Sequence, residues 1–364
     1  MKTPASEAEL AELVRTATAP LAIRGGGTRG IGKVAPAEVL DTSALSGIPL
    51  YEPGALTLVV QAGTPLAEIE STLAAEQQRL PFEAPDLRRL LGRSGSSTIG
   101  GVVATNASGP RRVQAGACRD SLIGVRFVDG MGGVISNGGR VMKNVTGYDL
   151  VKLMAGSHGS LGILTELSFK LLPAPETAQT LRLGGLDDAT AIAALSAALT
   201  SPYEVTGAAH WPGQGTFLRI EGFATSVAYR AAQLQRHLAR FGAVDPVTDD
   251  PWPAIRDVAP FHDTPGDVWR LSVKPSDAPG LVARAAADAA LYDWGGGLVW
   301  LRTAPGHDLR AALGPFDGHA TLIRTAPDTP LPRFHPEPAP IAALTAGLRA
   351  RFDPRGLFNP GVMG

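Results

Sequence analysis

Cysteine is almost absent from this sequence: Cys118 is the single one in 364 residues. The chain therefore forms no internal disulfide, and it lacks the set of thiolates that an iron–sulfur cluster or a structural zinc ion requires. We expect Cys118 to be a small buried apolar residue. Any redox chemistry here must use another kind of cofactor.

An excess of charge of either sign is also missing. The sequence has 33 Lys and Arg residues against 34 Asp and Glu residues, and its formal net charge is −1. No bulk charge attracts nucleic acid or an anionic membrane surface. No apolar run approaches the roughly 18 residues that span a bilayer. The first residues carry acids where a signal peptide carries positive charge, so we expect a cytoplasmic protein without direct membrane insertion.

Metal-ligand patterns are missing as well. The seven histidines are scattered along the chain, and none shows the i, i+2 or i, i+4 spacing that is typical of a metal site. We predict no metal.

The sequence does contain enough apolar material for buried cores, with 44% hydrophobic and 18% charged residues, and its length favours two domains. Strand and helix signals alternate up to a boundary at Pro173 and Pro175. Residues 176–329 show strands separated by helices near 188–199, 226–241 and 277–290, which predicts an antiparallel sheet with helices on one face. Residues 330–364 combine a proline-rich extended connector with a final helix and tail.

Local signals place several elements in the first part of the chain. Ser6 and Glu9 have the spacing of a helix capping box. Thr64 and Pro65 predict an N-cap and a first helical residue, for a helix that follows the strand 56–62 and runs to about residue 77. Two strands surround residues 129–130, and alternation of apolar and polar residues predicts a half-buried strand over 163–171.

The densest motif is Arg24-Gly25-Gly26-Gly27-Thr28-Arg29-Gly30-Ile31-Gly32-Lys33. It matches G-x-G-x-x-G and G-x-x-x-x-G-K, but no helix follows either pattern, so dinucleotide-binding Rossmann and nucleoside-triphosphate sites are both disfavoured. Consecutive glycines can instead turn successive N–H groups into one concavity that suits a diphosphate, with Arg24 and Thr28 as flanking donors. The alternative for this loop alone is a tight turn between strands.

Two further segments are rich in glycine and small residues, at 96–109 and 156–163. The second of these precedes the predicted strand 163–171, where glycine lets a flat ring pack directly on the backbone. Three such loops in one part of the chain predict a long ligand.

Taken together, these segments resemble the flavoproteins of the vanillyl-alcohol oxidase and para-cresol methylhydroxylase (PCMH) type. The marks are the first glycine loop, Thr98-Ile99-Gly100-Gly101 with the small residues after it, Arg119-Asp120, the loop 156–163, and the tail from Asp353-Pro354 to Asn359-Pro360-Gly361. Within the family, residues 108–112 and 141–149 look most like the FAD-binding subunits of bacterial glycolate-oxidising complexes.

The resemblance implies an α+β fold. It implies a PCMH-type FAD-binding domain of two α+β subdomains in residues 1–175, a small antiparallel α+β cap in residues 176–329, and a connector and tail, residues 330–364, that return to the FAD domain. Family members that attach FAD through a histidine carry it in the first glycine loop, where Thr28 stands here, so we expect non-covalent FAD. The implied cofactor-binding residues are Arg24, Gly25, Gly26, Gly27, Thr28, Gly30, Ser97, Thr98, Ile99, Gly100, Gly101, Ala104, Asn106, Gly109, Asp120, Gly156, Gly159, Gly162, Ile163 and Asn359.

Oxidation of a 2-hydroxy acid by flavin needs a cation for the carboxylate and a base for the hydroxyl proton. Arg270, in an apolar strand, is the candidate clamp, and a structural ion pair is its alternative role. His319 and Arg324 lie five residues apart on a strand and so point to opposite faces, and His319 is the candidate base. Tyr148 and Lys143 could donate to flavin or substrate, or serve only the structure.

One departure from the family is plain. Relatives that oxidise D-2-hydroxy acids carry a metal motif of the form H-x-G-D-G-N-x-H in the cap, and nothing here resembles it. The first hypothesis is that FAD on this chain accepts a hydride from a 2-hydroxy acid such as glycolate and passes electrons to an iron–sulfur subunit. The second is an FAD-binding relay or assembly subunit beside a larger FAD subunit. Any peripheral attachment to the inner membrane would come through these partners.

Overall fold

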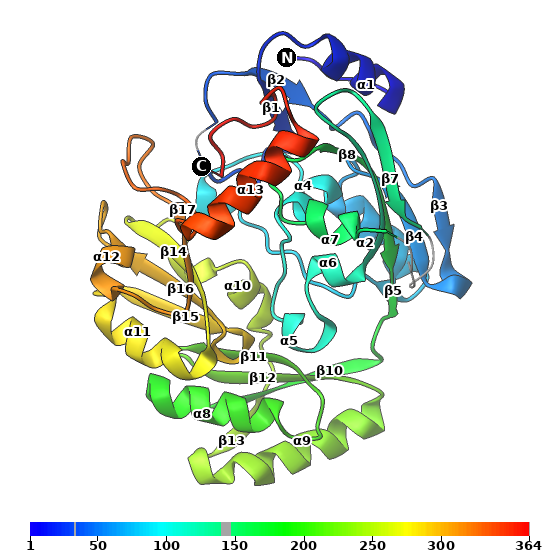
Figure 1. Cartoon of the computed structure of the whole chain (residues 1–364). Coiled ribbons are helices and arrows are strands. Elements are labelled where there is room, and N and C mark those ends of the chain that lie inside the picture. The colour runs from blue at the N-terminus through cyan, green and yellow to red at the C-terminus, as the bar shows by residue number, and fades with distance from the viewer. Residues whose placement is uncertain (33, 140–146, 364) are drawn as a thin grey trace.

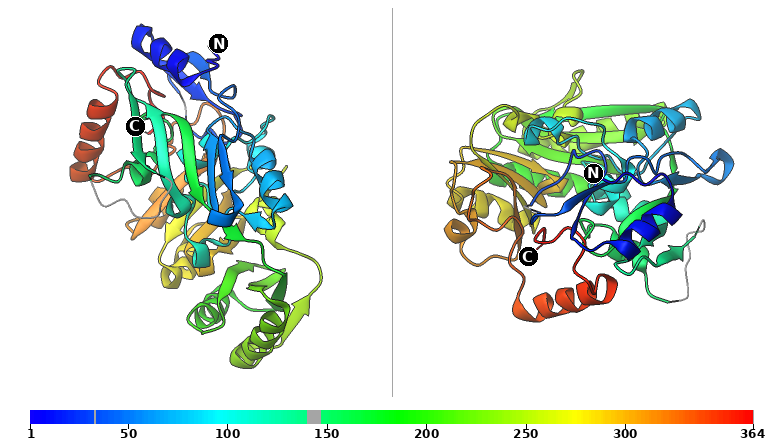
Figure 2. Two further views of the ribbon diagram at one scale, coloured as in Figure 1. Left: turned by 90° about the vertical axis from the view of Figure 1, so that its right-hand side faces the viewer. Right: turned by 90° about the horizontal axis from the view of Figure 1, so that it is seen from above.

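The computed structural model describes residues 1–32, 34–139 and 147–363, arranged around two antiparallel sheets (Figure 1, Figure 2). The first sheet consists, in spatial order, of β3 (Leu50–Glu52), β4 (Thr57–Gln61), β8 (Ile163–Lys170), β6 (Leu122–Val128) and β7 (Val134–Gly138). The second sheet consists, in spatial order, of β13 (Val244–Val247), β10 (Thr177–Leu183), β12 (Gly215–Gly222), β11 (Val205–Trp211), β15 (Ala289–Asp293), β16 (Leu298–Thr303), β14 (Asp267–Val273) and β17 (Gly318–Arg324). Smaller pairs are β1 (Leu21–Arg24) with β2 (Glu38–Asp41), and β5 (Gln78–Arg79) with β9 (Leu172–Pro173).

Helices and short helical turns surround the two sheets. In the first part of the chain they are α1 (Glu7–Thr16), α2 (Leu66–Ala75), α3 (Arg88–Leu91), α4 (Ile99–Ala104), α5 (Arg112–Ala115), α6 (Cys118–Ser121) and α7 (Leu150–Met154). Beside the second sheet they are α8 (Asp188–Leu199), α9 (Ala224–Leu238), α10 (Trp252–Arg256), α11 (Ala278–Arg284) and α12 (Leu309–Leu313), and α13 (Ala339–Phe352) follows the connector.

Of the two predicted helix N-caps, the structure confirms one and contradicts the other. Ser6 caps α1, and its hydroxyl accepts a 3.2 Å hydrogen bond from the amide of Glu9, as predicted. The prediction that Thr64 caps the next helix is wrong. Pro65 occupies the N-cap of α2, and the Thr64 hydroxyl donates instead to the carbonyl of Gln61 at 2.8 Å, because the turn after β4 uses it.

Two predicted element descriptions also need correction. The predicted helix over 277–290 ends at Arg284, since Ala286 has a φ of 49° and residues 289–293 form β15. The predicted half-buried strand, β8, is buried on both faces along most of its length, because α1 covers one side and the helices of the first core cover the other.

Two main cores hold the structure together. The first lies between the first sheet and α2, α4, α6 and α7, and it contains the fully buried Cys118. Burial raises the pKa of the Cys118 thiol far above its usual value, so it is an inert apolar residue, as predicted. The second lies between the second sheet and α8, α9, α11 and α12, which cover one face as predicted, while α10 packs on the other face. The domain boundaries near residues 175 and 329 stay a prediction.

A buried cluster of ion pairs, which we call the interface network, joins the second sheet to the first part of the chain. Arg219 on β12 binds Glu83 through two hydrogen bonds of 2.8 and 2.9 Å. Glu221, also on β12, accepts from Arg111 and Arg79, each at 2.8 Å. Burial alone would raise the pKa of Glu221, but hydrogen bonds and charges from Arg111 and Arg219 outweigh it and hold the pKa at about 2. Both carboxylates are therefore ionised at neutral pH.

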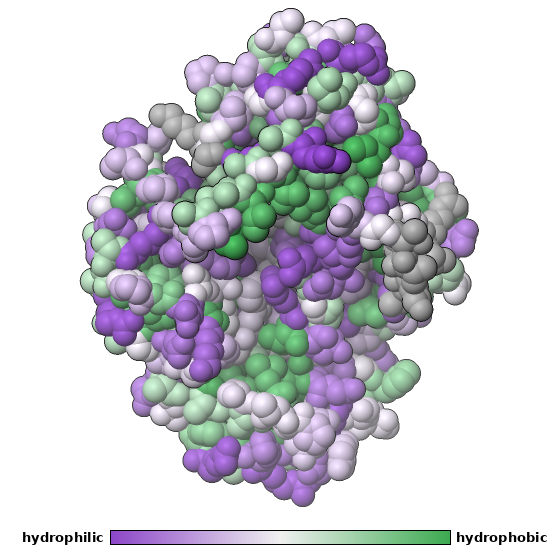
Figure 3. Space-filling view, viewed as in Figure 1, coloured by the Kyte–Doolittle hydropathy of each residue, from purple (hydrophilic) through white to green (hydrophobic). Residues whose placement is uncertain are grey.

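The connector and tail bring the chain back to its first strand. The connector lies extended along β17, where the amide of Leu322 donates to the carbonyl of Arg333 at 2.8 Å. After α13, the amide of Leu21 at the start of β1 donates to the carbonyl of Leu357 at 2.7 Å. None of the residues of α13 is buried, and Figure 3 shows the apolar surface that this helix presents, which includes Leu344 with 67% of its surface exposed.

Candidate functional site

The first glycine loop forms one wall of a cavity of about 490 Å³, which we call the glycine cavity. The loop directly follows β1, and the opposite wall comes from α4 and from the C-terminal tail. Thr98 caps α4 and accepts from the amide of Gly101 at 3.4 Å, so both residues are fixed beside the loop. Asn359 closes one end, because its side chain accepts from the amide of Ile23 at 2.7 Å and donates to the carbonyl of His158 at 2.8 Å.

Close backbone approach explains why this loop is glycine. A Cβ on Gly26 would lie 1.5 Å from the carbonyl oxygen of Ser96, and one on Gly25 would lie 2.5 Å from the hydroxyl of Thr98. Gly27 has a φ of 68°, in the left-handed region. The residues therefore form a bare backbone hollow that suits a diphosphate.

Gly26→Ala should abolish FAD retention, because the added methyl group cannot fit against the backbone of residue 96. We expect about a hundredfold weaker binding or more, measured by fluorescence titration of the FAD-free protein. Gly54→Ala is the matched control, because a Cβ there meets nothing within 4 Å and Gly54 lines neither cavity. Equal FAD affinity in both variants would contradict the assigned role of the hollow.

A second cavity of about 270 Å³, which we call the inner cavity, adjoins the first. Arg29, Ile31, Thr105 and His158 line both, so a ligand can run from one into the other. The inner cavity extends to β14 and β17 of the second sheet. A long ligand bound in the glycine cavity would therefore reach the second sheet.

Arg29 stands at the junction of the two cavities with an unused donor. Its Nε and Nη2 bind the hydroxyl of Ser97 at 3.2 and 3.1 Å, whereas Nη1 is buried and has no partner. Burial lowers the pKa of Arg29 to about 10, so it stays charged at neutral pH. A buried orphan donor is costly unless a ligand satisfies it. The glycine hollow and this free charge together fit a diphosphate-bearing cofactor such as FAD.

Arg270 and His319 face the inner cavity from adjacent strands. Arg270 on β14 pairs with Thr321 on β17, and His319 pairs with Ser272, so both side chains lie on the same face of the sheet. Burial and the nearby charge of Arg112 lower the pKa of Arg270 to about 10. Within the described residues, no carboxylate forms an ion pair with Arg270, so the structural ion pair considered above is not present.

His319 is held as a neutral imidazole. Partial burial, and then the charge of Arg270, lower the pKa of His319 below its usual 6.5. Arg324, five residues after His319, lies outside both cavities. Its guanidinium donates to the carbonyls of Phe261 and Thr264, each at 2.7 Å. Only one of the two residues therefore reaches the cavity, as their spacing predicts.

His158 is a cavity residue that the sequence analysis did not single out. It has a φ of 52°, and its ring packs edge-on against Phe334 with 5.0 Å between centroids. Burial and the charge of Arg270 lower the pKa of His158 to about 4, so it is neutral. In the sequence, the only sign that His158 and Arg29 lie at the cavities is their position inside the third and first glycine loops. The sequence around Phe334, in the proline-rich connector, contains no sign that this ring lines a cavity.

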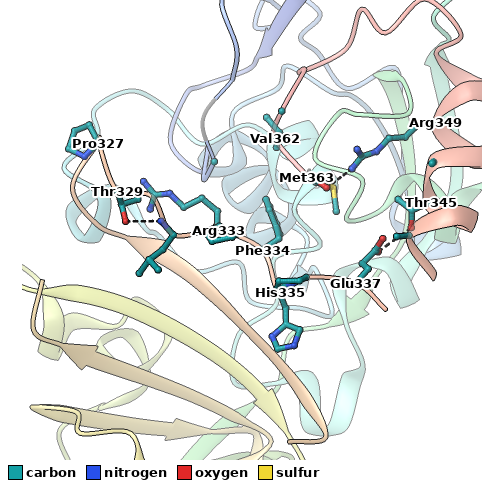
Figure 4. Close-up of a pocket in the computed structure, with 17 residues that line it drawn as sticks. Pro327, Thr329, Arg333, Phe334, His335, Glu337, Thr345, Arg349, Val362 and Met363 are labelled. Carbon is teal, nitrogen blue, oxygen red and sulfur yellow. Dashed lines mark hydrogen bonds between the residues drawn. The ribbon is translucent and has the colours of Figure 1, made fainter. Parts of the chain in front are cut away.

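A third cavity of about 580 Å³ lies between the connector and α13 (Figure 4). Phe334 and Met363 line both this outer cavity and the inner one, and in Figure 4 the Phe334 ring points toward Val362 and Met363. Arg349 donates to the carbonyl of Met363 at 2.8 Å and so ties α13 to the tail. The connector and tail thus separate the inner cavity from the outer one.

The predicted cofactor residues divide into two groups. Those that line the glycine or inner cavity are Arg24, Gly25, Gly26, Gly27, Thr28, Gly30, Thr98, Gly101, Ala104, Asn106 and Asn359. Those that line neither are Ser97, Ile99, Gly100, Gly109, Asp120, Gly156, Gly159, Gly162 and Ile163.

Packing and backbone contacts account for the second group. A Cβ on Gly100, Gly109 or Gly162 would lie 2.7 Å or less from a neighbouring atom. Ile99 and Ile163 belong to the cores. The Ser97 hydroxyl holds Arg29, and the Ser97 carbonyl accepts from the amide of Leu66 at 2.8 Å. Gly156 and Gly159 have left-handed φ angles of 90° and 70° and shape the loop around His158. The carboxylate of Asp120 accepts from the amide of Ala117 at 2.8 Å.

The structure does not bring the remaining catalytic candidate to the cavities. Tyr148 is 88% exposed, and its carbonyl accepts from Asn137 on β7 at 3.1 Å. Lys143 lies outside the described residues. Within the described part of the chain, no group of three or more His, Cys, Asp or Glu side chains could hold a metal ion. Its helices include none that is both long and apolar enough to cross a membrane.

Comparisons with known proteins agree with this geometry. A family model described as an FAD binding domain matches residues 1–138. The chain is 35% identical over 347 residues to glycolate oxidase subunit GlcE of Escherichia coli (strain K12), covering 94% of this chain and 92% of the relative. It is 38% identical over 165 residues to glycolate oxidase subunit GlcD of Bacillus subtilis (strain 168), covering 44% of this chain and 34% of that protein.

Solved structures of alkyldihydroxyacetonephosphate synthase share the fold. One of them superimposes with a TM-score of 0.72 at 17% sequence identity, covering 98% of this chain and 76% of that chain. Together with the matched FAD binding domain, this likeness confirms the predicted α+β fold with a PCMH-type FAD-binding domain, and FAD as the cofactor.

Proposed function

Because the chain belongs to the family of the glycolate oxidase subunit GlcE, we propose that it is the FAD-binding subunit of a complex that oxidises 2-hydroxy acids, with glycolate as the first substrate to test. FAD, when bound, supplies the acceptor for a hydride from C2 of the acid. The residues of this chain bind the cofactor, hold the carboxylate of the substrate and take up its hydroxyl proton.

The glycine hollow and Arg29 are the groups that hold the cofactor. The loop and Arg29 line the glycine cavity, the Nη1 of Arg29 is a free donor, and Asn359 fixes the end of β1 beside the loop. Thr28 stands where covalent family members carry histidine, so the flavin is bound without a covalent link. Acid precipitation of the purified protein tests this: yellow flavin should remain in the supernatant, and a yellow pellet would contradict it.

One observation carries the choice of an acidic substrate. The inner cavity contains the charged Arg29 and Arg270, and no carboxylate is among its described lining residues. Unpaired buried cations are unfavourable unless an anion enters with them. Arg270 therefore binds the carboxylate of the acid, and the guanidinium geometry allows two parallel hydrogen bonds.

His319 is the base of the proposed mechanism. It lies on the same face as Arg270 and has no hydrogen-bond partner among the described residues, so its ring nitrogen is free to accept the hydroxyl proton. Partial burial, and then the charge of Arg270, lower the pKa of His319 and so keep the imidazole neutral at physiological pH. Proton uptake by His319 then accompanies loss of the C2 hydride.

The lowered pKa of His319 predicts the pH dependence of flavin reduction. A base acts while deprotonated, so the rate should be constant above pH 6.5 and fall only as the pH drops through a pKa below that value. Anaerobic stopped-flow reduction by glycolate between pH 4.5 and 8 would measure it. His319→Gln should remove this acid limb and slow the reaction about a hundredfold or more. If the rate of the His319→Gln variant still fell at acid pH in the same way, the titrating group would be a residue other than His319.

The proposed complex also needs a partner that would take up the electrons carried by bound FAD. We assign an iron–sulfur subunit and a larger FAD subunit as partners, and the family relationship to a glycolate oxidase subunit supports an assembly of this kind. The complex would lie in the cytoplasm, at the inner membrane only through those partners.

Anaerobic addition of glycolate or D-lactate to the FAD-loaded chain tests the substrate assignment. Loss of the visible flavin absorption supports oxidation on this chain. Retention of the absorption, with reduction only after the larger FAD subunit is added, favours the relay or assembly role, which the missing H-x-G-D-G-N-x-H motif also supports.

A further inference from the structure

Trp294 occupies a strained turn beside Arg270, which lines the inner cavity. It follows β15 and has a φ of 53°, which is unfavourable for a bulky side chain. The carboxylate of Asp293 accepts from the amide of Trp294 at 2.7 Å and holds the turn. Gly295 and Gly296 follow with φ angles of 67° and 102°. Strain of this kind persists only where the surrounding contacts fix it.

A hydrogen bond to the first part of the chain fixes the indole of Trp294. Its Nε1 donates to the carbonyl of Gly109 at 3.0 Å, and Gly109 lies just before α5 in the first part of the chain. Gly109 has little freedom, because a Cβ there would lie 2.4 Å from the carbonyl oxygen of Glu83. The position of the ring is thus set by the contact between the two parts of the chain.

Two arginines lie over this ring. The guanidinium of Arg112 is 4.3 Å from its centroid, and that of Arg270 is 5.3 Å away. Neither forms an ion pair or a hydrogen bond within the described residues. The electron-rich face of an indole attracts guanidinium groups and so offsets their mutual repulsion.

We propose that Trp294 is a positioning residue that holds Arg270 in the inner cavity, oriented to bind the carboxylate of the substrate. This inference rests on the proposed function. A carboxylate partner would also hold Arg270, but it would neutralise the charge that the substrate needs. The neutral indole fixes the guanidinium and leaves its hydrogen-bond donors for the ligand.

Oxalate, an unreactive carboxylate, measures this role without turnover. Its dissociation constant is obtained from the flavin difference spectrum of the FAD-loaded protein. Trp294→Leu should weaken oxalate binding about tenfold, whereas Trp294→Phe, which keeps an aromatic face, should stay within about threefold of the natural protein. Trp211→Leu removes another partly buried indole of the same core, over which no described residue places a cation, and should leave oxalate binding unchanged.

A double-mutant cycle separates positioning from general damage. In an Arg270→Met background, Trp294→Leu should have no further effect on oxalate binding, because the group that it positions is gone. FAD affinity should stay within about twofold across the set. Independent, additive effects of the two substitutions, or equal losses in the Trp211 control, would overturn the inference. Failure of the natural protein to bind oxalate would overturn the proposed function as well.

Discussion

Replacing Arg270 by methionine should slow flavin reduction by glycolate about a hundredfold to a thousandfold. Truncating one partner of a buried charged pair costs about 2–5 kcal/mol, and here the lost pair is the one between Arg270 and the carboxylate of the substrate. Methionine keeps a long apolar side chain in the sheet, so packing beside Trp300 and Thr321 is largely preserved. The loss should appear as a higher half-saturation concentration together with a lower limiting rate.

The measurement is anaerobic stopped-flow reduction with glycolate varied at fixed pH. FAD affinity should change little, since the diphosphate is held in the glycine cavity, which Arg270 does not line. Arg182→Met is the control, because Arg182 lies exposed on β10. If the Arg270→Met variant were reduced as fast as the Arg182→Met control, Arg270 would have no role in the mechanism. The assignment of the FAD site would not be affected by that result.

Glu83→Gln should destabilise the folded protein by about 3–5 kcal/mol, because it removes the carboxylate that binds the buried guanidinium of Arg219 and leaves only Glu221, 3.9 Å away, to pair with that charge. Arg219 is buried and binds Glu83 through two hydrogen bonds. Urea unfolding followed by tryptophan fluorescence measures the change. Glu204→Gln is the matched control: Glu204 also binds an arginine, Arg230, at 3.0 Å, but its side chain is 73% exposed.

The control variant should lose less than about 1 kcal/mol, since solvent screens an exposed ion pair. Similar losses in both variants would show that the interface network contributes no more than a surface pair.

The interface network also makes the stability of the folded protein depend on pH in the acid range. Because the folded-state pKa of Glu221 is about 2 against an ordinary value of 4.5, its contribution is complete above pH 4.5 and is lost as the pH falls toward 2.

The parts of the fold that could be predicted from the sequence are those with local signals. The Ser6 cap and the helix at 188–199 depend on residues within a few positions of one another, and the first glycine loop is visible as a run of neighbouring glycines. The helix that stops at Arg284 has no such stop signal, and the strand β15 that replaces it depends on pairing with β16, which lies later in the chain. Pairing between strands overrides a helical pattern there.

The candidate site shows the same division. Arg270 and His319 could be singled out because charged or polar residues in an apolar strand need a reason. The cavity role of Arg29 could not, since an orphan donor is visible only when its surroundings are known. Several glycines predicted to touch FAD line neither cavity, and Gly162 allows close packing against Phe127. A glycine required for packing and one required for binding look identical in a sequence.

The amide side chain of Asn359 joins backbone groups of Ile23 and His158, and the first of these bonds spans 336 positions of the chain. During synthesis, these two hydrogen bonds therefore form only after residue 359 has left the ribosomal exit tunnel, so the cavity for the flavin nucleotide is completed late.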